Sequence, residues 1–248
     1  MTPVIPVLEV DLGPGIRAFF TTRHGGRSGA PWDSLNLGLG VGDDAGTVRA
    51  NRALVDQVAG GQVTFGTQVH GTDVVTVTAR GLGAPPPEAD ALVAAAPGVP
   101  VGVYVADCVP VLLADPRARV VAVAHAGRPG VEHGVVPAVL EAVLAAGARL
   151  GDLRAVVGPA VCGECYEVPA ELQERVAARV PAARSQTSWG TAALDLPRAV
   201  EVQLEAAGVR RVQRVHRCTR TDDTFFSHRR SSAAGTPAGR FAGVVTLV

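Results

Sequence analysis

The sequence predicts an α/β (α+β) protein, a single-domain mixed β-sheet sandwich flanked by helices. Short segments that are rich in β-branched residues and bounded by Gly, Pro or Asp recur along the chain, which is typical of strands. Helical segments lie between only some of these strands, and several strands follow one another directly through a turn. This pattern favours mixed sheets over a regular strand–helix ladder, and we expect one domain over residues 1–248.

The expected strands either alternate apolar and polar residues or form short apolar runs. They cover residues 16–22, 63–69, 74–78, 101–106, 110–114, 120–125, 153–157, 212–216 and 243–248.

The expected helices place their apolar residues on one face. The first covers residues 47–59, and the second covers 135–146 and stops at Gly147. A third covers 169–180 and begins with a proline in its first turn. The fourth is capped by Asp195 and ends before Gly208. Residues 80–88 and 231–239, which are rich in small residues and turn formers, are expected to be loops.

The composition excludes several classes of partner. Lys+Arg and Asp+Glu both number 23, so the net charge is zero and we expect no nucleic acid or anionic membrane as a ligand. The first residues lack the pattern of a signal peptide, and the most apolar stretch, 99–114, is interrupted by Asp107 and two prolines. Four cysteines are too few for a disulfide scaffold, so we expect a cytoplasmic protein with mostly reduced thiols.

A β-hairpin over residues 104–125 contains the first candidate metal ligands. Residues 115–118, Asp-Pro-Arg-Ala, form a favourable turn. Folding the chain about the middle of this turn places Leu113 opposite Val120, and Cys108 opposite His125. Directly opposed residues of an antiparallel pair have Cβ atoms about 5 Å apart, close enough for two side chains to share one metal ion.

His70 is the third candidate ligand and follows the strand expected at 63–69. Histidine and cysteine together suit zinc or copper. Three protein ligands leave a fourth position for water, which is the pattern of a catalytic zinc site. Spacing alone does not connect His70 to Cys108 and His125, and each residue alone is also compatible with an ordinary polar or core position.

The segment Cys162-Gly-Glu-Cys165 has the spacing of a redox pair. A redox disulfide would require a helix from the first cysteine, and Pro169 follows too soon for a long one. A second metal site would need two further ligands, and none is near in sequence. We therefore expect structural thiols near the pocket.

Many short segments match one known family in its own order. They include Gln68-Val-His-Gly71, Ala106-Asp-Cys-Val-Pro-Val-Leu-Leu113 and Ala124-His-Ala-Gly127. Further matches are residues 21–26, 34–38, 41–44, 51–52, 89–93, 157–159, 165–168, 218–219 and 226–230. The chain resembles the laccase-domain purine nucleoside phosphorylase family, also described as multicopper polyphenol oxidase-like or peptidoglycan editing factor-like proteins.

This resemblance implies that His70, Cys108 and His125 are both metal ligands and the catalytic centre, with Zn²⁺ as the ion and Cu²⁺ as the alternative. It implies a fold distantly similar to cysteine hydrolase-like toxins. The implied activity is phosphorolysis of adenosine, inosine or methylthioadenosine, together with deamination of adenosine. Competing with it are a copper-dependent polyphenol oxidase and a peptidoglycan-precursor editing enzyme or cell-wall partner protein. The expected partners are a nucleoside and phosphate, for a monomer or small homo-oligomer.

The sequence departs from the family at two places. The usual His-Ala-Gly-Trp-Arg-Gly is here His125-Ala-Gly-Arg-Pro-Gly130, and the usual Tyr-Arg-Arg is His228-Arg-Arg230. If the missing arginine of the first motif holds phosphate, its role is either taken by Arg128 or lost.

Phosphorolysis needs cationic side chains that hold phosphate, and the planar guanidinium suits this task. We take Arg23, Arg128 and Arg229 as candidates, whereas Arg52 is expected to form an ion pair on its helix. Asp107 is the carboxylate considered for substrate contact or for proton transfer in a deaminase. Strand alternation directs it away from Cys108, so a structural role is equally compatible.

Two rival chemistries are less favoured by the sequence. The signature of nucleobase deaminases, His-x-Glu with Pro-Cys-x-x-Cys, is absent. A multicopper centre needs many imidazoles, and the chain has six histidines with no His-x-His pair. Copper oxidase chemistry is therefore expected to be secondary.

Overall fold

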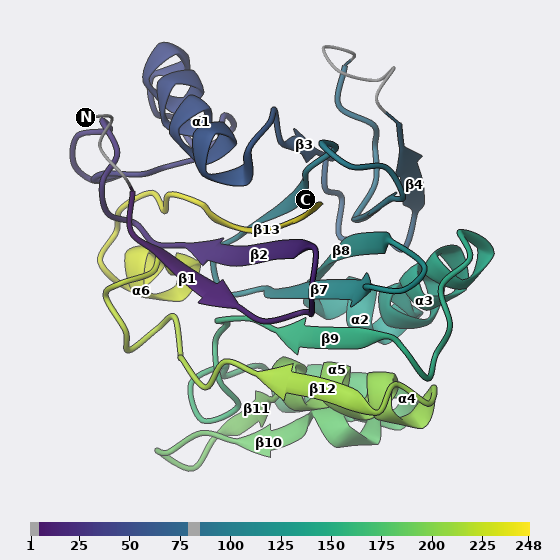
Figure 1. The fold of residues 1–248 in the computed structure, drawn as a ribbon. Coiled ribbons are helices and arrows are strands. Elements are labelled where there is room, and N and C mark those ends of the chain that lie inside the picture. Colours follow the sequence, from purple (N-terminus) through teal and green to yellow (C-terminus); the bar gives the residue numbers. More distant parts are fainter. Residues whose placement is uncertain (1–4, 79–84) are drawn as a thin grey trace.

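The computed structural model describes residues 5–78 and 85–248, and its two large sheets pack face to face (Figure 1). The order of the five-stranded sheet is β1 (Val7–Val10), β2 (Ile16–Thr21), β13 (Phe241–Leu247), β6 (Val101–Val105) and β3 (Thr64–Phe65). The order of the six-stranded sheet is β12 (Arg211–Arg214), β9 (Arg154–Val157), β7 (Val109–Asp115), β8 (Val120–Ala126), β5 (Ala91–Ala94) and β4 (Val74–Val77). A separate ribbon pairs β10 (Arg184–Gln186) with β11 (Ala192–Leu194).

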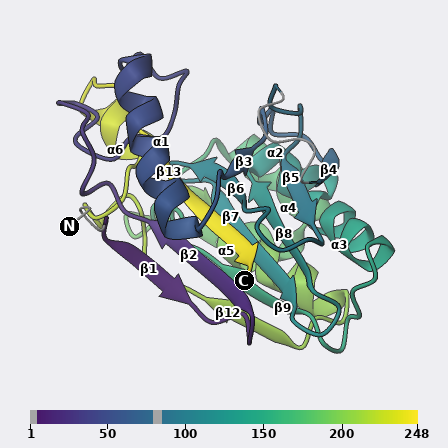
Figure 2. The same cartoon turned by 45° about the horizontal axis from the view of Figure 1, so that its top comes forward.

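Helices cover the two outer faces of this sandwich (Figure 2). Helix α1 (Ala45–Ala59) lies on the five-stranded sheet. Helices α3 (Val135–Ala145) and α5 (Leu196–Ala206) lie on the six-stranded sheet, and α4 (Ala170–Arg179) packs beside them against the β10–β11 ribbon. Two short helices, α2 (Arg128–His133) and α6 (His228–Ala233), lie at the ends of strands and loops that form the site described below.

The central strands β7 and β8 are buried along their whole length. Successive side chains of a strand point to opposite faces. Leu112 and Val123 therefore pack between the sheets with Phe20 of β2, whereas Leu113 and its neighbours pack against the helices. A strand covered on both faces is apolar throughout, which explains why this part of the sequence contains continuous apolar runs.

Both sheets are mixed. The pairs β9–β12, β4–β5 and β3–β6 are parallel, and the other pairs of the two sheets are antiparallel. This confirms the expected mixed α/β architecture. The expected relationship to cysteine hydrolase-like toxins stays a prediction.

The four long helices lie where the sequence predicts them. Asp195 caps α5 by accepting a hydrogen bond from the Arg198 amide at 2.9 Å. Gly147 adopts a φ of 103° just after α3, a conformation that favours glycine. The loop expected at 231–239 begins only after residue 233, because the short helix α6 extends to Ala233. Ser227 caps this helix by accepting a hydrogen bond from the Arg230 amide. Of the loop expected at 80–88, residues 80–84 lie outside the described residues.

The prediction of a strand over residues 63–69 is wrong beyond Phe65, where β3 ends. The Gln68 side chain takes the place of a backbone partner, since its Oε1 accepts from the Tyr104 amide at 2.7 Å and its Nε2 donates to the Tyr104 carbonyl at 2.8 Å. The strands β1, β5, β10 and β11 are not predicted from the sequence either. All four have only three or four residues and carry weak local signals.

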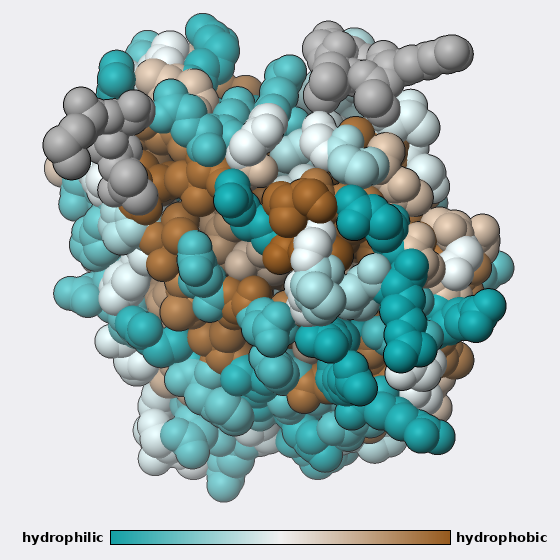
Figure 3. Space-filling model, in the orientation of Figure 1, coloured by the Kyte–Doolittle hydropathy of each residue, from teal (hydrophilic) through white to brown (hydrophobic). Residues whose placement is uncertain are grey.

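Among the described residues, none of the helices has the length and apolar character needed to cross a bilayer. On the face shown in Figure 3, hydrophobic residues gather around β1 and β2, and hydrophilic residues dominate the lower part, where β12 and the β10–β11 ribbon lie.

Replacing Leu112 by alanine tests the packing between the sheets. Leu112 is fully buried, so the substitution leaves a cavity and lowers the free energy of unfolding by about 2–5 kcal/mol. The matched control is Leu144→Ala on α3, because Leu144 is 38% exposed and is expected to cost less than about 1 kcal/mol. Urea denaturation of both variants provides the measurement. An equal decrease in the free energy of unfolding of both variants would contradict the packing of Leu112 between the two sheets.

Candidate metal centre

The structure brings together the three predicted ligands from different parts of the fold. His70 lies in the turn between β3 and β4, Cys108 in the bend between β6 and β7, and His125 near the end of β8. One ligand atom from each residue lies within 4.8 Å of the others. Cys108 Sγ is 3.7 Å from His70 Nε2, and the two imidazole rings meet edge to face with centroids 4.7 Å apart.

The hairpin register differs from the expected one by two residues. Leu113 pairs with Ala122, and His125 pairs with Pro110. The difference arises because the connection is longer than a tight turn, with the Asp115 carboxylate accepting from the amides of Arg117 and Ala118. A shift of two residues keeps every side chain on its face. Cys108 and His125 therefore still converge, although they are not directly opposed.

Asp90 organises two of the three ligands and was not predicted as a site residue. Its buried carboxylate accepts the His125 Nδ1 proton at 2.7 Å. It also accepts the amides of Val69, His70 and Gly71 at 3.1, 3.0 and 2.7 Å. The bond to Nδ1 directs the other nitrogen of His125 toward the ligand cluster, as carboxylates do for metal-bound histidines. The sequence signals for Asp90 are its place ahead of an apolar segment and within the family match at residues 89–93, and neither signal assigns it a role at the site.

Backbone geometry at the site is unusual. His70 and Asp107 adopt φ values of 62° and 88°, a region that non-glycine residues rarely occupy and that clusters at functional sites. At Gly127 a side chain would not fit, because a Cβ atom would lie 2.5 Å from His70 Cδ2 and 3.3 Å from Cys108 Sγ. The glycine of the His-Ala-Gly motif is therefore required for His70 and Cys108 to approach β8.

The charges of the site stabilise an ion pair between Cys108 and His125. Burial by itself would raise the pKa of Cys108, but the charge and hydrogen bond of His125 and the hydrogen bond of His70 lower it to about 6. Burial opposes protonation of His125, but the Cys108 thiolate and Asp90 raise its pKa to about 9. Burial would also raise the pKa of Asp90, and the hydrogen bonds from His125, Gly71 and Val69 hold it below its ordinary value.

The donor set fits a zinc ion. Zn–N and Zn–S bonds of about 2.0 and 2.3 Å in a tetrahedron place N and S about 3.5 Å apart. The observed separation of 3.7 Å between His70 Nε2 and Cys108 Sγ matches this value closely. Two imidazoles and one thiolate, with one histidine oriented by a buried carboxylate, are ligands that zinc and copper both accept.

Two clefts meet at these ligands, and His70, Cys108 and His228 line both. The first cleft has a volume of about 740 Å³ and is also lined by Arg128, Tyr166 and Arg229. The second has a volume of about 690 Å³ and is also lined by Arg52, Tyr104 and Arg240. A substrate with two chemically different parts could therefore contact the centre from both sides.

The predicted phosphate-binding residues are placed differently from one another. Arg128 and Arg229 line the first cleft. Arg128 donates to Glu132 at 3.3 Å, and Arg229 donates to the Glu167 carbonyl at 2.7 Å. Arg23 is not among the described residues lining either cleft, and its guanidinium is bonded to Asp33.

Asp107 and Arg52 also have partners that the sequence did not reveal. Asp107 lines the first cleft, but its carboxylate accepts from the Thr219 hydroxyl and the Arg229 amide, both at 2.6 Å. These bonds give it a structural role. Arg52 does not make the expected ion pair but donates to the Leu37 carbonyl and lies 4.7 Å from the centre of the Tyr104 ring.

Comparison with known proteins defines the class. Residues 17–248 match the family described as multi-copper polyphenol oxidoreductase laccase, and the chain belongs to this family. Among its relatives, a purine nucleoside phosphorylase of Streptomyces coelicolor is 49% identical over 89% of this chain and 92% of the relative. A purine nucleoside phosphorylase of Mycobacterium tuberculosis is 44% identical over 94% of this chain and 92% of the relative.

Solved structures show the same fold. A Neisseria meningitidis protein has a TM-score of 0.86 and 34% identity, covering 97% of this chain and 98% of its own. YlmD from Geobacillus stearothermophilus has a TM-score of 0.84 and 32% identity, covering 94% and 92%. The family resemblance noted from the sequence motifs is thereby confirmed.

Replacing Asp90 by asparagine tests its role as the orienting carboxylate. The substitution removes the charged acceptor from His125 and is expected to weaken zinc binding by about tenfold to a hundredfold. Zinc affinity is measured by competition with a chromophoric chelator. The matched control is Asp115→Asn, since Asp115 is also buried and accepts three backbone amides, but at the far end of β7. A similar affinity loss in both variants would argue against a specific role for Asp90.

The ion pair predicts a pH window in the metal-free protein. The pKa of Cys108 is depressed to about 6, so its stabilising thiolate is present at neutral pH and lost as the pH falls through 6. The pKa of His125 is raised to about 9, so its stabilising charge is lost as the pH rises through 9. Alkylation of Cys108 by iodoacetamide, followed by peptide mass spectrometry, should have a midpoint near pH 6.

Cys165 is the internal control for this measurement, because burial raises its pKa. It is expected to react slowly at neutral pH in the same sample. A midpoint for Cys108 near the ordinary thiol value of about 8.5 would refute the ion pair.

Proposed function

We propose that the protein is a zinc-dependent purine nucleoside phosphorylase that acts on adenosine, inosine or methylthioadenosine with phosphate. The observation that carries this proposal is the meeting of two clefts at His70 and Cys108, with Arg128 and Arg229 lining the first cleft and His125 lining the second. The names of the relatives support the substrate class.

In the proposed reaction a phosphate oxygen forms a bond to C1′ of the ribose. The bond from C1′ to the purine nitrogen breaks, and its electron pair leaves with the purine. Addition of a proton to the purine gives the free base together with ribose 1-phosphate, or with 5-methylthioribose 1-phosphate when the substrate is methylthioadenosine. The protein must hold phosphate near C1′ and stabilise the charge that develops on the leaving base.

Arg128 and Arg229 are the proposed phosphate ligands. Arg128 is the first residue of α2 and is anchored by Glu132, which is itself buried and also pairs with Arg175 and Arg179. Arg229 is anchored by the Glu167 carbonyl and lies 4.6 Å from the centre of the Tyr166 ring. These contacts fix both side chains before phosphate binds, which lowers the entropy lost on binding. Arg128 then supplies the positive charge that the family motif places one residue later.

The second cleft is the proposed nucleoside site. Phe65 and Tyr104 stack there with ring centroids 4.0 Å apart, next to Arg52. In this proposal His228, which lines both clefts, donates a hydrogen bond to the leaving purine. A zinc ion held by the three ligands would act as a Lewis acid toward a bound substrate oxygen or nitrogen. Asp90 keeps His125 in the orientation that this requires.

Adenosine deamination is a secondary hypothesis. Asp107, the carboxylate adjacent to Cys108 in sequence, accepts hydrogen bonds from the Thr219 hydroxyl and the Arg229 amide, and these bonds favour a structural role over that of a proton shuttle. A copper-dependent polyphenol oxidase and a peptidoglycan-precursor editing enzyme or cell-wall partner protein are rival hypotheses. We further propose a single domain over residues 1–248 that acts in the cytoplasm as a monomer or small homo-oligomer. The four free thiols are consistent with a reducing compartment.

The decisive measurement is phosphate-dependent release of hypoxanthine from inosine by the zinc-loaded protein. Cys108→Ala is expected to abolish the activity, because it removes one of the three ligands. Arg128→Ala is expected to raise the KM for phosphate by roughly tenfold to a hundredfold, as for the loss of a charged hydrogen bond.

Arg23→Ala is the matched control, because Arg23 is bonded to Asp33 and is not among the described residues of either cleft. Its KM for phosphate is expected to be unchanged. Release of hypoxanthine without phosphate would indicate a hydrolase, and ammonia from adenosine would indicate a deaminase. Oxygen consumption with a phenol and copper would favour the oxidase. Activity that survives Cys108→Ala would refute the proposed centre.

A further inference from the structure

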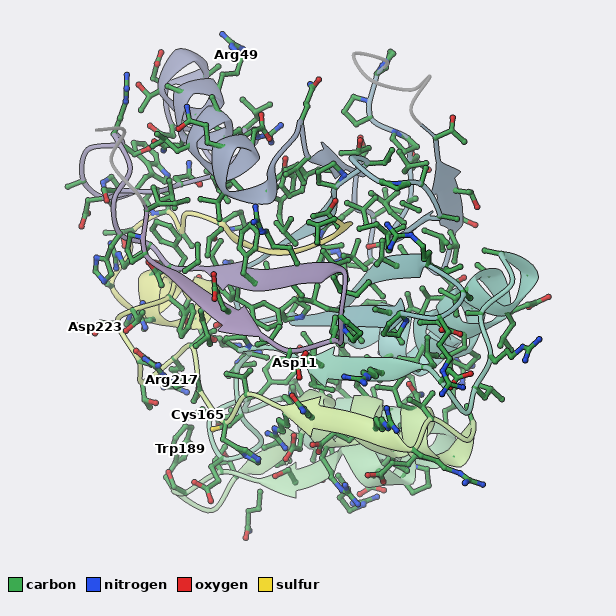
Figure 4. All side chains as sticks on the ribbon, viewed as in Figure 1. Asp11, Arg49, Cys165, Trp189, Arg217 and Asp223 are labelled. Carbon is green, nitrogen blue, oxygen red and sulfur yellow. The ribbon has the colours of Figure 1, made fainter. Side chains whose placement is uncertain are left out.

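A second cluster of metal-binding side chains lies outside the site described above. Cys162 and Cys165 belong to the loop between β9 and α4, and Cys218 belongs to the segment between β12 and α6. Their sulfur atoms all lie within 4.8 Å of one another. The structure therefore supplies a third ligand for the Cys-x-x-Cys segment from a part of the chain that sequence spacing could not reveal. In Figure 4 the labelled Cys165 lies near Arg217 and Trp189.

Backbone hydrogen bonds hold the two loops in this arrangement. Ala160 and Cys218 form a parallel bridge, in which the Thr219 amide donates to the Ala160 carbonyl at 3.0 Å. The amides of Cys165 and Tyr166 both donate to the Cys162 carbonyl at 3.0 Å, which closes a tight turn around the Cys-x-x-Cys segment. These backbone hydrogen bonds fix the positions of the three cysteines relative to one another.

We propose that Cys162, Cys165 and Cys218 together bind one thiophilic metal ion, Zn²⁺, at a site separate from His70, Cys108 and His125. Thiolate sulfurs about 2.3 Å from a tetrahedral zinc lie about 3.8 Å apart. The three sulfurs all lie within 4.8 Å of one another, which is close to this spacing. Cys162 and Cys218 are half-buried, so an ion can enter from solvent, whereas Cys165 is buried.

The surroundings suit a negatively charged thiolate site. The Cys162 amide donates to Cys218 Sγ at 3.4 Å, a contact that stabilises charge on sulfur. Three thiolates and one Zn²⁺ carry a net charge of −1. Arg220 lies next to the cluster, where it donates to the Cys165 carbonyl at 2.9 Å and stacks on Trp189.

The fourth coordination position is left to water. A cavity of about 150 Å³ adjoins Cys162 and Cys218 and is also lined by Arg214 and His216. This volume is large enough for water. Three sulfurs that converge favour a metal over a disulfide, because a disulfide uses two sulfurs and leaves the third without a partner.

The proposed zinc ion would stabilise the loop that forms one side of the first cleft. The loop that carries Cys162 also carries Val161 and Tyr166, which line that cleft. The Val161 amide donates to the Asp107 carbonyl at 3.0 Å, and the Thr219 hydroxyl donates to the Asp107 carboxylate at 2.6 Å. A metal that joins Cys162 and Cys165 to Cys218 therefore cross-links the two segments that hold Asp107 beside Cys108.

Zinc content of the full-length protein tests the proposal. After reconstitution with Zn²⁺ and removal of free ion, we expect about two zinc ions per chain in the wild type. Cys165→Ser and Cys108→Ala should each lose about one, and the double variant should lose both. Cobalt substitution distinguishes the sites, because the thiolate-to-cobalt absorption should be stronger in Cys108→Ala, which keeps three sulfurs, than in Cys165→Ser.

Circular dichroism establishes that Cys165→Ser is folded. If it is not, Cd²⁺ titration of Cys108→Ala provides the test without altering the cluster, and cadmium–thiolate absorption should saturate at about one ion per chain. One zinc ion in the wild type with none in Cys108→Ala would overturn the proposal. A wild-type mass lower by two hydrogens, with a disulfide between two of the three cysteines in freshly purified protein, would overturn it in favour of a thiol pair.

Discussion

The site depends on the hydrogen bonds that the buried carboxylate of Asp90 accepts. Asp90 precedes β5 and is fully buried, so its charge requires several donors. Those donors are the amides of Val69, His70 and Gly71, and the imidazole of His125. One side chain thereby joins the turn after β3 to strand β8. Loss of this charge would release two ligands at once, because the same group fixes the backbone of one and the ring of the other.

A second carboxylate, that of Asp107, likewise joins distant segments of the chain, and it lies next to Cys108 in sequence. It accepts from the Thr219 hydroxyl and the Arg229 amide, which come from the last part of the chain before β13. The unusual φ values of His70 and Asp107 are therefore held by hydrogen bonds from distant segments. Such strain persists only where the surrounding structure fixes it, and here it brings Cys108 and His70 to Gly127.

The sandwich supplies the rigidity behind these contacts. Strands β7 and β8 are buried on both faces, so the bend before β7 and the end of β8 cannot move independently of the core. The clefts lie where loops from both sheets meet at these strand ends. Arg128 and Arg229 lie in the first turns of the short helices α2 and α6, respectively. The scaffold thus fixes the candidate metal ligands, and the proposed phosphate ligands lie in the two short helices that adjoin them.

The sequence by itself determined the long helices, the apolar central strands and the candidates His70, Cys108 and His125. Helix caps such as Asp195 and apolar runs are local signals, and family motifs are short segments. The hairpin register, the role of Asp90 and the joining of Cys218 to Cys162 were decided only by the tertiary structure. Asp90 lies 35 residues from His125, and Cys162 lies 56 residues from Cys218. Contacts at such separations depend on how the sheets pack, and no local pattern encodes that packing.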